Sequence, residues 1–399
     1  MRRGILICIP FLLLFGSGLA ESASFTIRKV VAAGEDAPQG GTFTQFDPAA
    51  VHGHGAILFD ALIKKKEGQF HGVYLARGSS LSRVVATGDS SPLGGTFIEL
   101  SFMALNGRGH VAFLGSATGG VARAIYYTEG AGLKKVVAVG EPSPGGGVLR
   151  EFADVAFNDA GAVAFLGRVG QSKVPRALFL ASAGGLVKVL GVGEPTPVGG
   201  RFAAFINLSL NNRGEMAFEG KIHGGRSPSG IFVGSQSGVR KVVAVGDPSP
   251  VGGTFRDLAL PVVNEHGDVV FWASLEGAKV PAGLFLASAG GIEKLVARGD
   301  PAPGGGRFSF IGLSYSFNRS GMVAFQAGIT EGEASAGIFL AEKGRVTSVV
   351  RVGDPTPLGG RFTDLTGPEV GHNGTVAFAA GIDRGQSSSG LFLAVPTGR

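Results

Sequence analysis

Five polar side chains recur at one position of a repeated sequence, and four of them are carboxylates. Each stands two residues after the phenylalanine or leucine that opens an apolar segment: Gln45, Glu99, Glu151, Asp257 and Asp364. The other two copies of the repeat have Ala204 and Phe310 at this position. Carboxyl groups that lie close together raise one another's pKa, and a pair of them can perform acid–base chemistry. We expect these five residues to bind a ligand if the fold brings them around one axis.

The same pattern fits two simpler arrangements. Arg150 and Arg256 directly precede two of the acids, so the carboxylates could be paired with arginine in a water-filled channel. The side chains could also point between neighbouring repeats instead of toward an axis. Acid–base catalysis by these carboxylates is therefore the alternative to simple binding.

A second set of acids follows a glycine in every repeat: Glu35, Asp89, Glu141, Glu194, Asp247, Asp300 and Asp354. Calcium requires six to eight oxygen ligands, whereas each of these segments supplies only one or two acids. We interpret each carboxylate as an acceptor of backbone N–H groups in the proline turn that follows it. The sequence therefore predicts no metal site here.

Other chemical motifs are weak or missing. His52 and His54 form a local pair with His71 nearby, but their spacing does not dictate the further ligands that a metal needs. The sequence has no Gly-x-Ser-x-Gly or His-Glu-x-x-His motif, and its glycine-rich segments lack the lysine and helix of a phosphate loop. We predict no catalytic residue, no metal and no cofactor, and a binding protein more readily than an enzyme.

The elements that position these residues come from seven repeats. The segment over residues 34–41 returns at Gly88, Gly140, Gly193, Gly246, Gly299 and Gly353, at intervals of 52 to 54 residues. Each repeat contains four short segments rich in Val, Ile and Phe and bounded by Gly, Pro or Asn, which is typical of strands. No sustained helical periodicity occurs. Glycine is abundant, with 69 of 399 residues, as expected for many strands joined by tight turns.

Four strands in each of seven repeats predict an all-β fold, a seven-bladed β-propeller with antiparallel blades. A solenoid is the alternative, but its end repeats would need polar caps, and neither terminus resembles one. The chain instead begins with a fourth-strand segment over residues 25–33 and ends with a blade that lacks its last strand. We therefore expect the N-terminal strand to pair with the C-terminal blade and close the ring.

A further motif, Asn-x-x-Gly-x-x-Ala-Phe, begins at Asn106, Asn158, Asn211 and Asn318, with a near copy at Asn264. Its asparagine can bond the backbone two residues on while the glycine takes a positive φ, so we interpret it as a turn between the first and second strands. This motif resembles that of the bacterial exported proteins with tandem NxxGxxAF repeats and a choice of anchors. His52 and Gly371 depart from it. The resemblance implies export and repeats, and no activity.

The N-terminus has the pattern of a secretory signal. Arg2 and Arg3 precede an apolar run over residues 4–15, and Gly18 and Ala20 suit a cleavage site. We expect residues 1–20 to be the signal peptide and residues 21–399 to be one propeller domain, without a membrane span. The only cysteine, Cys8, lies in this segment, so the mature chain has no disulfide. The net charge of +6 is too small to indicate nucleic acid.

The connections between the second and third strands vary most and are basic. They contain Lys64, Lys65, Lys66, Arg168, Lys173, Arg176, Lys221, Arg226 and Lys279. In a propeller these connections share a face with the proline-rich segments, and function commonly resides on such loops. The sequence therefore predicts a secreted, extracellular or periplasmic, monomeric scaffold that binds a protein or an acidic polysaccharide on this face. The alternatives are a hydrolase or lyase that uses the channel carboxylates, and a structural component of the cell surface.

Overall fold

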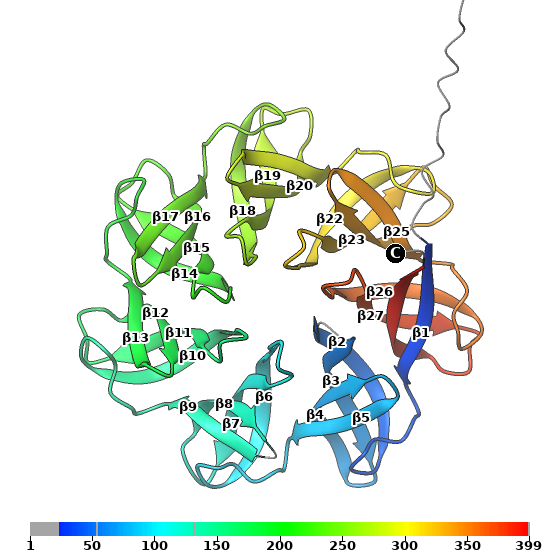
Figure 1. The fold of residues 1–399 in the computed structure, drawn as a ribbon, viewed down its shortest axis with the longest axis horizontal. Helices are drawn as coiled ribbons and strands as arrows, with labels where there is room; N and C mark the ends of the chain where they lie inside the picture. The colour runs from blue at the N-terminus through cyan, green and yellow to red at the C-terminus, as the bar shows by residue number, and fades with distance from the viewer. Residues whose placement is uncertain (1–23, 53–54, 131, 398–399) are drawn as a thin grey trace, which may run out of the picture.

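The protein is a ring of seven four-stranded antiparallel sheets in this computed structural model (Figure 1). The structure describes residues 24–52, 55–130 and 132–397, and all regular structure within them is β-strand. The predicted seven-bladed β-propeller is therefore confirmed. No helix long and apolar enough to cross a membrane occurs in these residues. The expected signal peptide, residues 1–20, and His54 lie outside the described residues.

Each blade runs from an innermost strand beside the central axis to an outermost strand at the rim. The innermost strands are β2 (Thr42–His52), β6 (Thr96–Leu105), β10 (Val148–Phe157), β14 (Arg201–Leu210), β18 (Thr254–Val263), β22 (Arg307–Phe317) and β26 (Arg361–Val370). The second strands are β3 (Ala56–Lys65), β7 (Val111–Thr118), β11 (Val163–Gly170), β15 (Met216–His223), β19 (Val269–Glu276), β23 (Val323–Thr330) and β27 (Val376–Asp383).

The outer half of each blade has the same order. The third strands are β4 (Gly68–Arg77), β8 (Arg123–Glu129), β12 (Arg176–Ser182), β16 (Ser229–Ser235), β20 (Ala282–Ser288), β24 (Ala336–Glu342) and β28 (Ser389–Thr397). The outermost strands are β5 (Ser80–Ala86), β9 (Gly132–Ala138), β13 (Gly185–Gly191), β17 (Gly238–Ala244), β21 (Gly291–Ala297), β25 (Arg345–Arg351) and β1 (Ser24–Ala32). Each blade is named below by its innermost strand.

The ring closes through the N-terminal strand, as the sequence predicts. Strand β1 lies outermost in the β26 blade and pairs antiparallel with β28, from Ser24 opposite Thr397 to Ala32 opposite Gly390. Without β1, strand β28 would present an unpaired edge, which is a site for aggregation. The out-of-phase start and end of the sequence therefore complete one sheet.

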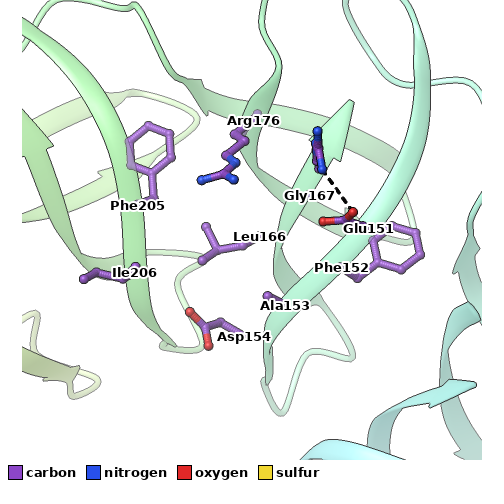
Figure 2. A pocket seen from close by; sticks show the side chains of 11 residues that line it. Glu151, Phe152, Ala153, Asp154, Leu166, Gly167, Arg176, Phe205 and Ile206 are labelled. Carbon is purple, nitrogen blue, oxygen red and sulfur yellow. Dashed lines mark hydrogen bonds and ion pairs between the residues drawn. The ribbon is translucent and has the colours of Figure 1, made fainter. Parts of the chain in front are cut away.

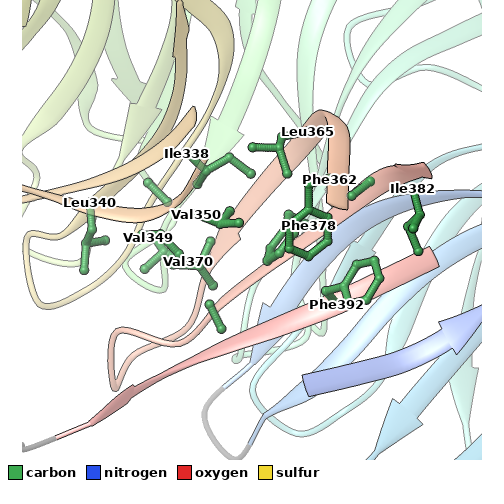
Figure 3. Packing of buried hydrophobic residues seen from close by; sticks show 14 of the residues in the cluster. Ile338, Leu340, Val349, Val350, Phe362, Leu365, Val370, Phe378, Ile382 and Phe392 are labelled. Atoms are coloured by element: carbon green, nitrogen blue, oxygen red, sulfur yellow. The ribbon is translucent and has the colours of Figure 1, made fainter. Parts of the chain in front are cut away.

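Three aromatic rings, two stacked and one edge-on, form the centre of most blades. In the β26 blade, the Phe378 and Phe392 rings stack at 5.6 Å, and Phe362 meets Phe392 edge-on at 5.1 Å. These rings pack against Ile338 and Val350 of the preceding blade (Figure 3). Each fully buried phenylalanine stabilises the fold by about 1.5–3 kcal/mol. The blades are thus joined by a continuous apolar layer between neighbouring sheets.

Four of the turn asparagines do more than close their own hairpins. The side-chain oxygen of Asn158 accepts the Ala162 N–H at 2.8 Å. The side-chain amide of Asn158 donates to the backbone carbonyl of Asn211 in the next blade at 3.0 Å. Asn106, Asn211 and Asn318 donate to the next blade in the same way, at 2.8–3.2 Å. The turn interpretation is confirmed, and the motif also links consecutive blades near the axis.

This link predicts the cost of removing one amide. Asn158 is 4% exposed, so Asn158→Ala leaves the Ala162 N–H buried without its partner and removes one of two bonds to the Asn211 carbonyl, which the Gly214 N–H still reaches at 3.1 Å. We expect a loss of about 2–4 kcal/mol in the free energy of unfolding, measured by urea denaturation. The control is Asn373→Ala, because exposed Asn373 bonds only Thr375 within its own turn and should cost about 1 kcal/mol. Equal losses would show that the link between blades adds no stability.

Candidate functional site

The proline-rich connections and the second-to-third-strand connections lie on one face, here called the loop-rich face. The two sets touch directly: a Cβ on Gly95 would lie 1.2 Å from the Thr118 carbonyl oxygen, and Gly95 has a φ of +74°. Only glycine fits this close approach. Residues 39–42 and 64–67 enclose an open hollow of about 780 Å³ on this face, lined by three lysines. The asparagine turns end the innermost strands on the opposite face, here called the turn face.

The five predicted site residues are exposed on the innermost strands, and the acids find partners within their own blades. Glu99 accepts the Ser116 hydroxyl at 3.1 Å, and Glu151 pairs with Arg168 at 3.1 Å. Asp257 pairs with Arg256 at 3.0 Å, and Asp364 accepts the Gly381 N–H at 3.2 Å. Gln45 lies opposite Leu62. Ligand binding by these residues stays a prediction.

The electrostatics of these acids are those of paired carboxylates. A hydrogen bond from Ser274, and then the Arg256 guanidinium, hold the pKa of Asp257 below its ordinary value. No group of three or more His, Cys, Asp or Glu side chains within the described ranges could hold a metal ion. The innermost strands therefore carry four exposed carboxylates, each with a partner in its own blade.

The acids that follow the glycine have a structural role, but their hydrogen bonds differ from the expectation. Asp247 accepts the Ala244 N–H at 2.8 Å and pairs with Lys241 at 2.9 Å. The bond thus goes to the end of the preceding outermost strand and not into the following proline turn. The reason is the turn itself, in which the Asp247 N–H bonds the Ala244 carbonyl and folds the side chain back. Asp89 and Asp300 repeat this geometry.

A groove opens between the β10 and β14 blades (Figure 2). It has a volume of about 250 Å³, and Leu166 and Phe205 form an apolar floor. Glu151 holds Arg168 at one side, whereas exposed Arg176 has no hydrogen bond or ion pair from its guanidinium in the described part of the chain. Figure 2 shows the Arg176 guanidinium pointing over this floor. The β10–β14 groove therefore offers an uncompensated cation beside apolar surface.

The residue directly after the turn asparagine is the position that sequence reasoning missed. At the turn face, these residues converge on a cavity of about 220 Å³ to which all seven blades contribute. Arg319 crosses the ring and lies 3.3 Å from Asp159 and 3.9 Å from Glu265. The Asp159 carboxylate also accepts the Asn212 amide at 2.9 Å. The sequence does mark this cluster, because five successive repeats have a polar or charged residue at this position: Asp159, Asn212, Glu265, Arg319 and His372.

Two histidines complete this turn-face cluster. The His52 and His372 rings meet edge-on at 4.9 Å, and His52 Nε2 lies 3.6 Å from Asp159. Burial, and then the charge of Arg319, lower the pKa of His372. Burial alone would raise the pKa of Asp159, but hydrogen bonds from the Gly107 N–H and Asn212, with the charges of His52 and Arg319, lower it. The cluster is a charge network that ties blades on opposite sides of the ring together.

The pKa of another acid at this cavity, Glu369, is raised, whereas that of Asp159 is lowered. Glu369 lines the same cavity from β26. Burial, with a contribution from the charge of Asp47, raises the pKa of Glu369 well above its ordinary value. Burial also raises the pKa of Asp47. Ionising these two carboxyls is less favourable in the folded chain than in the unfolded chain. Their contribution therefore lowers the free energy of unfolding as the pH rises above their ordinary pKa values.

The turn-face network predicts an acid-dependent contribution to stability. Because the folded pKa of Asp159 lies below its ordinary value of 3.8, its stabilisation is present above pH 3.8 and disappears as the pH falls through the folded pKa. Asp159→Asn should lower the free energy of unfolding by about 1–3 kcal/mol at pH 7. The difference from the natural chain should vanish in acid, as measured by urea denaturation across pH. Asp383→Asn, an exposed acid paired with Arg384, is the control and should cost little. A difference that does not depend on pH would contradict this account.

Several solved structures are similar to this chain at low sequence identity. The chain is similar to a puromycin-hydrolysing peptidase of Mycobacterium tuberculosis, with 13% identity over 89% of this chain and 52% of the peptidase, and a TM-score of 0.48. It thus spans about half of the peptidase. It is also similar to the polysaccharide lyase Uly1, with 11% identity over 95% and 98% of the two chains and a TM-score of 0.41. An uncharacterised protein of Listeria monocytogenes, lmo1340, matches at 8% identity over 77% and 82%, with a TM-score of 0.43. Similarity at this level does not indicate the function of the chain.

Sequence families give a more definite result. Among curated proteins, none matches the chain. A family model described as a family of unknown function (DUF7453) matches residues 15–336 and again residues 278–398. Together the two matches cover nearly the whole sequence, so the chain belongs to this family of unknown function.

Proposed function

We infer that this protein is a secreted, non-enzymatic propeller that binds an extracellular protein or an acidic polysaccharide with its loop-rich face. The single observation that carries this proposal is Arg176, whose guanidinium lies over the β10–β14 groove without a protein partner. The secretory pattern of residues 1–20 and the NxxGxxAF motif support export. The protein would act as a monomer, since β1 completes the β26 blade from within the same chain.

The groove suits a carboxylate that is attached to an apolar surface. A guanidinium binds a carboxylate through two parallel hydrogen bonds, and few other side chains match that geometry. Arg168 is near, but Glu151 already neutralises it. Leu166 and Phe205 would contact the apolar body of the ligand. A uronate ring has both features, since its carboxylate stands beside C–H faces, and so does an acidic side chain next to an aromatic residue.

The rest of the loop-rich face would extend this contact. Lys64, Lys65 and Lys66 line the open hollow at the β2 blade, and Lys173 and Arg226 lie on connections near the groove. Positive charges spread over one face favour a partner with repeated negative charges and speed its association. Such contacts weaken with added salt. An acidic polymer fits this distribution better than a small neutral ligand does.

The test is a binding measurement with polygalacturonate and with neutral dextran as probes. We expect the full mature chain to bind polygalacturonate, with an affinity that falls as salt is added, and not dextran. Arg176→Gln should weaken binding about ten- to a hundredfold, because one charge-assisted pair is lost. Arg28→Gln is the matched control. Arg28 is exposed on the outermost strand β1, and its substitution removes the same charge.

The comparison separates the groove from general charge. If Arg176→Gln and Arg28→Gln weaken binding equally, the β10–β14 groove is not the site. If dextran binds as well as polygalacturonate, carboxylate recognition is wrong. Thermal melting of both variants should match that of the natural chain, because both side chains are exposed.

A further inference from the structure

The large apolar side chains that the described residues expose are concentrated on the innermost strands. All five belong to β6, β14 or β22: Ile98, Phe102, Ile206, Phe310 and Leu313, which are 38–60% exposed. Single exposed apolar residues are normal, but a set gathered on one surface usually marks a binding site. The outer strands, which carry most of the protein surface, contribute none to this set. The exposed large apolar side chains of the described residues therefore all lie on the strands nearest the axis.

A cavity of about 320 Å³ lies beside two of these side chains, at mid-height in the channel. Five consecutive blades contribute to its wall, from β6 to β22. Phe102 and Leu313 line it, together with Met103, Leu260 and Tyr315. The volume falls within the range of small-molecule sites. This mid-channel cavity is distinct from the β10–β14 groove, although both touch Asp154.

The wall is built from residues that leave the strand ladder. In β18, Leu260 and Pro261 lie in the register shift between Ala259 and Val262. The register of β6 shifts in the same way around Phe102 and Met103. The non-glycine residues Phe102 and Leu260 have φ values of 50° and 52° there, a conformation that costs about 1–3 kcal/mol. Bulges of this kind re-aim side chains and are common beside functional sites.

The charge of the wall restricts what can bind. Asp154 is the only ionisable acid of the lining, and the lining has no basic side chain. Asp154 accepts the Asn207 N–H at 3.0 Å with one oxygen. Glu99 and Asp257 lie on the same innermost strands, three residues before the bulges, and are exposed toward the loop-rich end. An anionic ligand would meet no basic side chain in this lining, whereas a cation would be attracted to Asp154.

We propose that the mid-channel cavity binds a small cationic molecule that has an apolar body and one ammonium group. The apolar body contacts Phe102, Leu260 and Leu313, and the ammonium group lies toward the Asp154 carboxylate. This site and ligand class go beyond the loop-rich face, which binds anionic partners through Arg176. The two sites differ in ligand charge, so each can fail without the other.

The chain contains a natural reporter for this cavity. Trp272 is its only tryptophan, and the Trp272 backbone N–H donates to the Tyr315 hydroxyl at 3.1 Å. Tyr315 lines the cavity and also donates to the Leu260 carbonyl of the neighbouring blade. A ligand that contacts Tyr315 or Leu260 should therefore change the fluorescence of Trp272.

The experiment titrates the full mature chain with phenethylamine and, separately, with phenylacetate, which has a similar body and the opposite charge. Calorimetry measures binding, and Trp272 fluorescence reports its location. We expect saturable binding of phenethylamine with a Kd of about 1 mM or tighter, and at least tenfold weaker binding of phenylacetate. Asp154→Asn should remove the preference for the amine while it keeps an acceptor for the Asn207 N–H.

A matched pair of variants on β22 tests the location. Leu313 lines the cavity and Phe310 does not, although they are 56% and 50% exposed on the same strand. Leu313→Asn should weaken phenethylamine binding about tenfold or more, and Phe310→Asn less than about twofold. Both side chains are exposed, so both variants should melt like the natural chain.

Three results would overturn the proposal. They are the absence of saturable phenethylamine binding, equal binding of phenylacetate, and equal weakening of binding by the two β22 variants. Binding of polygalacturonate to the loop-rich face would be unaffected by any of these results. Failure here is therefore distinguishable from failure of the proposed function.

Discussion

The hydrogen bond from one turn asparagine to the carbonyl of the next blade determines how the channel is built. The Asn158 amide reaches Asn211, and the Asn318 amide reaches Gly371, so neighbouring turns stay at a fixed separation around the axis. This spacing brings the residues after the asparagines together, and it allows Arg319 to reach Asp159 across the ring. The bulged residues that line the mid-channel cavity lie a few positions earlier on the same strands, so the cavity depends on the same spacing.

Charge is divided between the two ends of the channel. At the turn face, Arg319 and the histidines balance Asp159 and Glu265, and the network contributes to stability. At the loop-rich end, the acids are exposed and paired only within their blades. Arg176 is the exception among the groove's ionisable groups, because it has no partner. The charges are thus paired across the ring at the turn face and within single blades at the other end.

Much of the fold could be predicted from the sequence, because a fixed repeat and an out-of-phase start leave few alternatives to a closed ring. The pairing of β1 with β28 follows from that argument. The site could be predicted only in part. Asparagine reveals a turn, but its bond to the next blade depends on the curvature of the ring. The bulges carry no common residue type, since Phe102, Asp154, Asn207 and Leu260 occupy equivalent positions, and so no local pattern marked the mid-channel cavity.

The closing strand has a consequence for the order of folding. Ser24 and Thr397 are 373 residues apart and bond to each other, so the first segment of the ring to be synthesised must wait for the last. The blades from β2 to β22 have all four strands from contiguous sequence and can form one after another as the chain emerges. Only the β26 blade needs both ends, and long-range pairing of this kind is slow. Assembly of the propeller is therefore a sequential process with a single late step, at which the whole chain must be present.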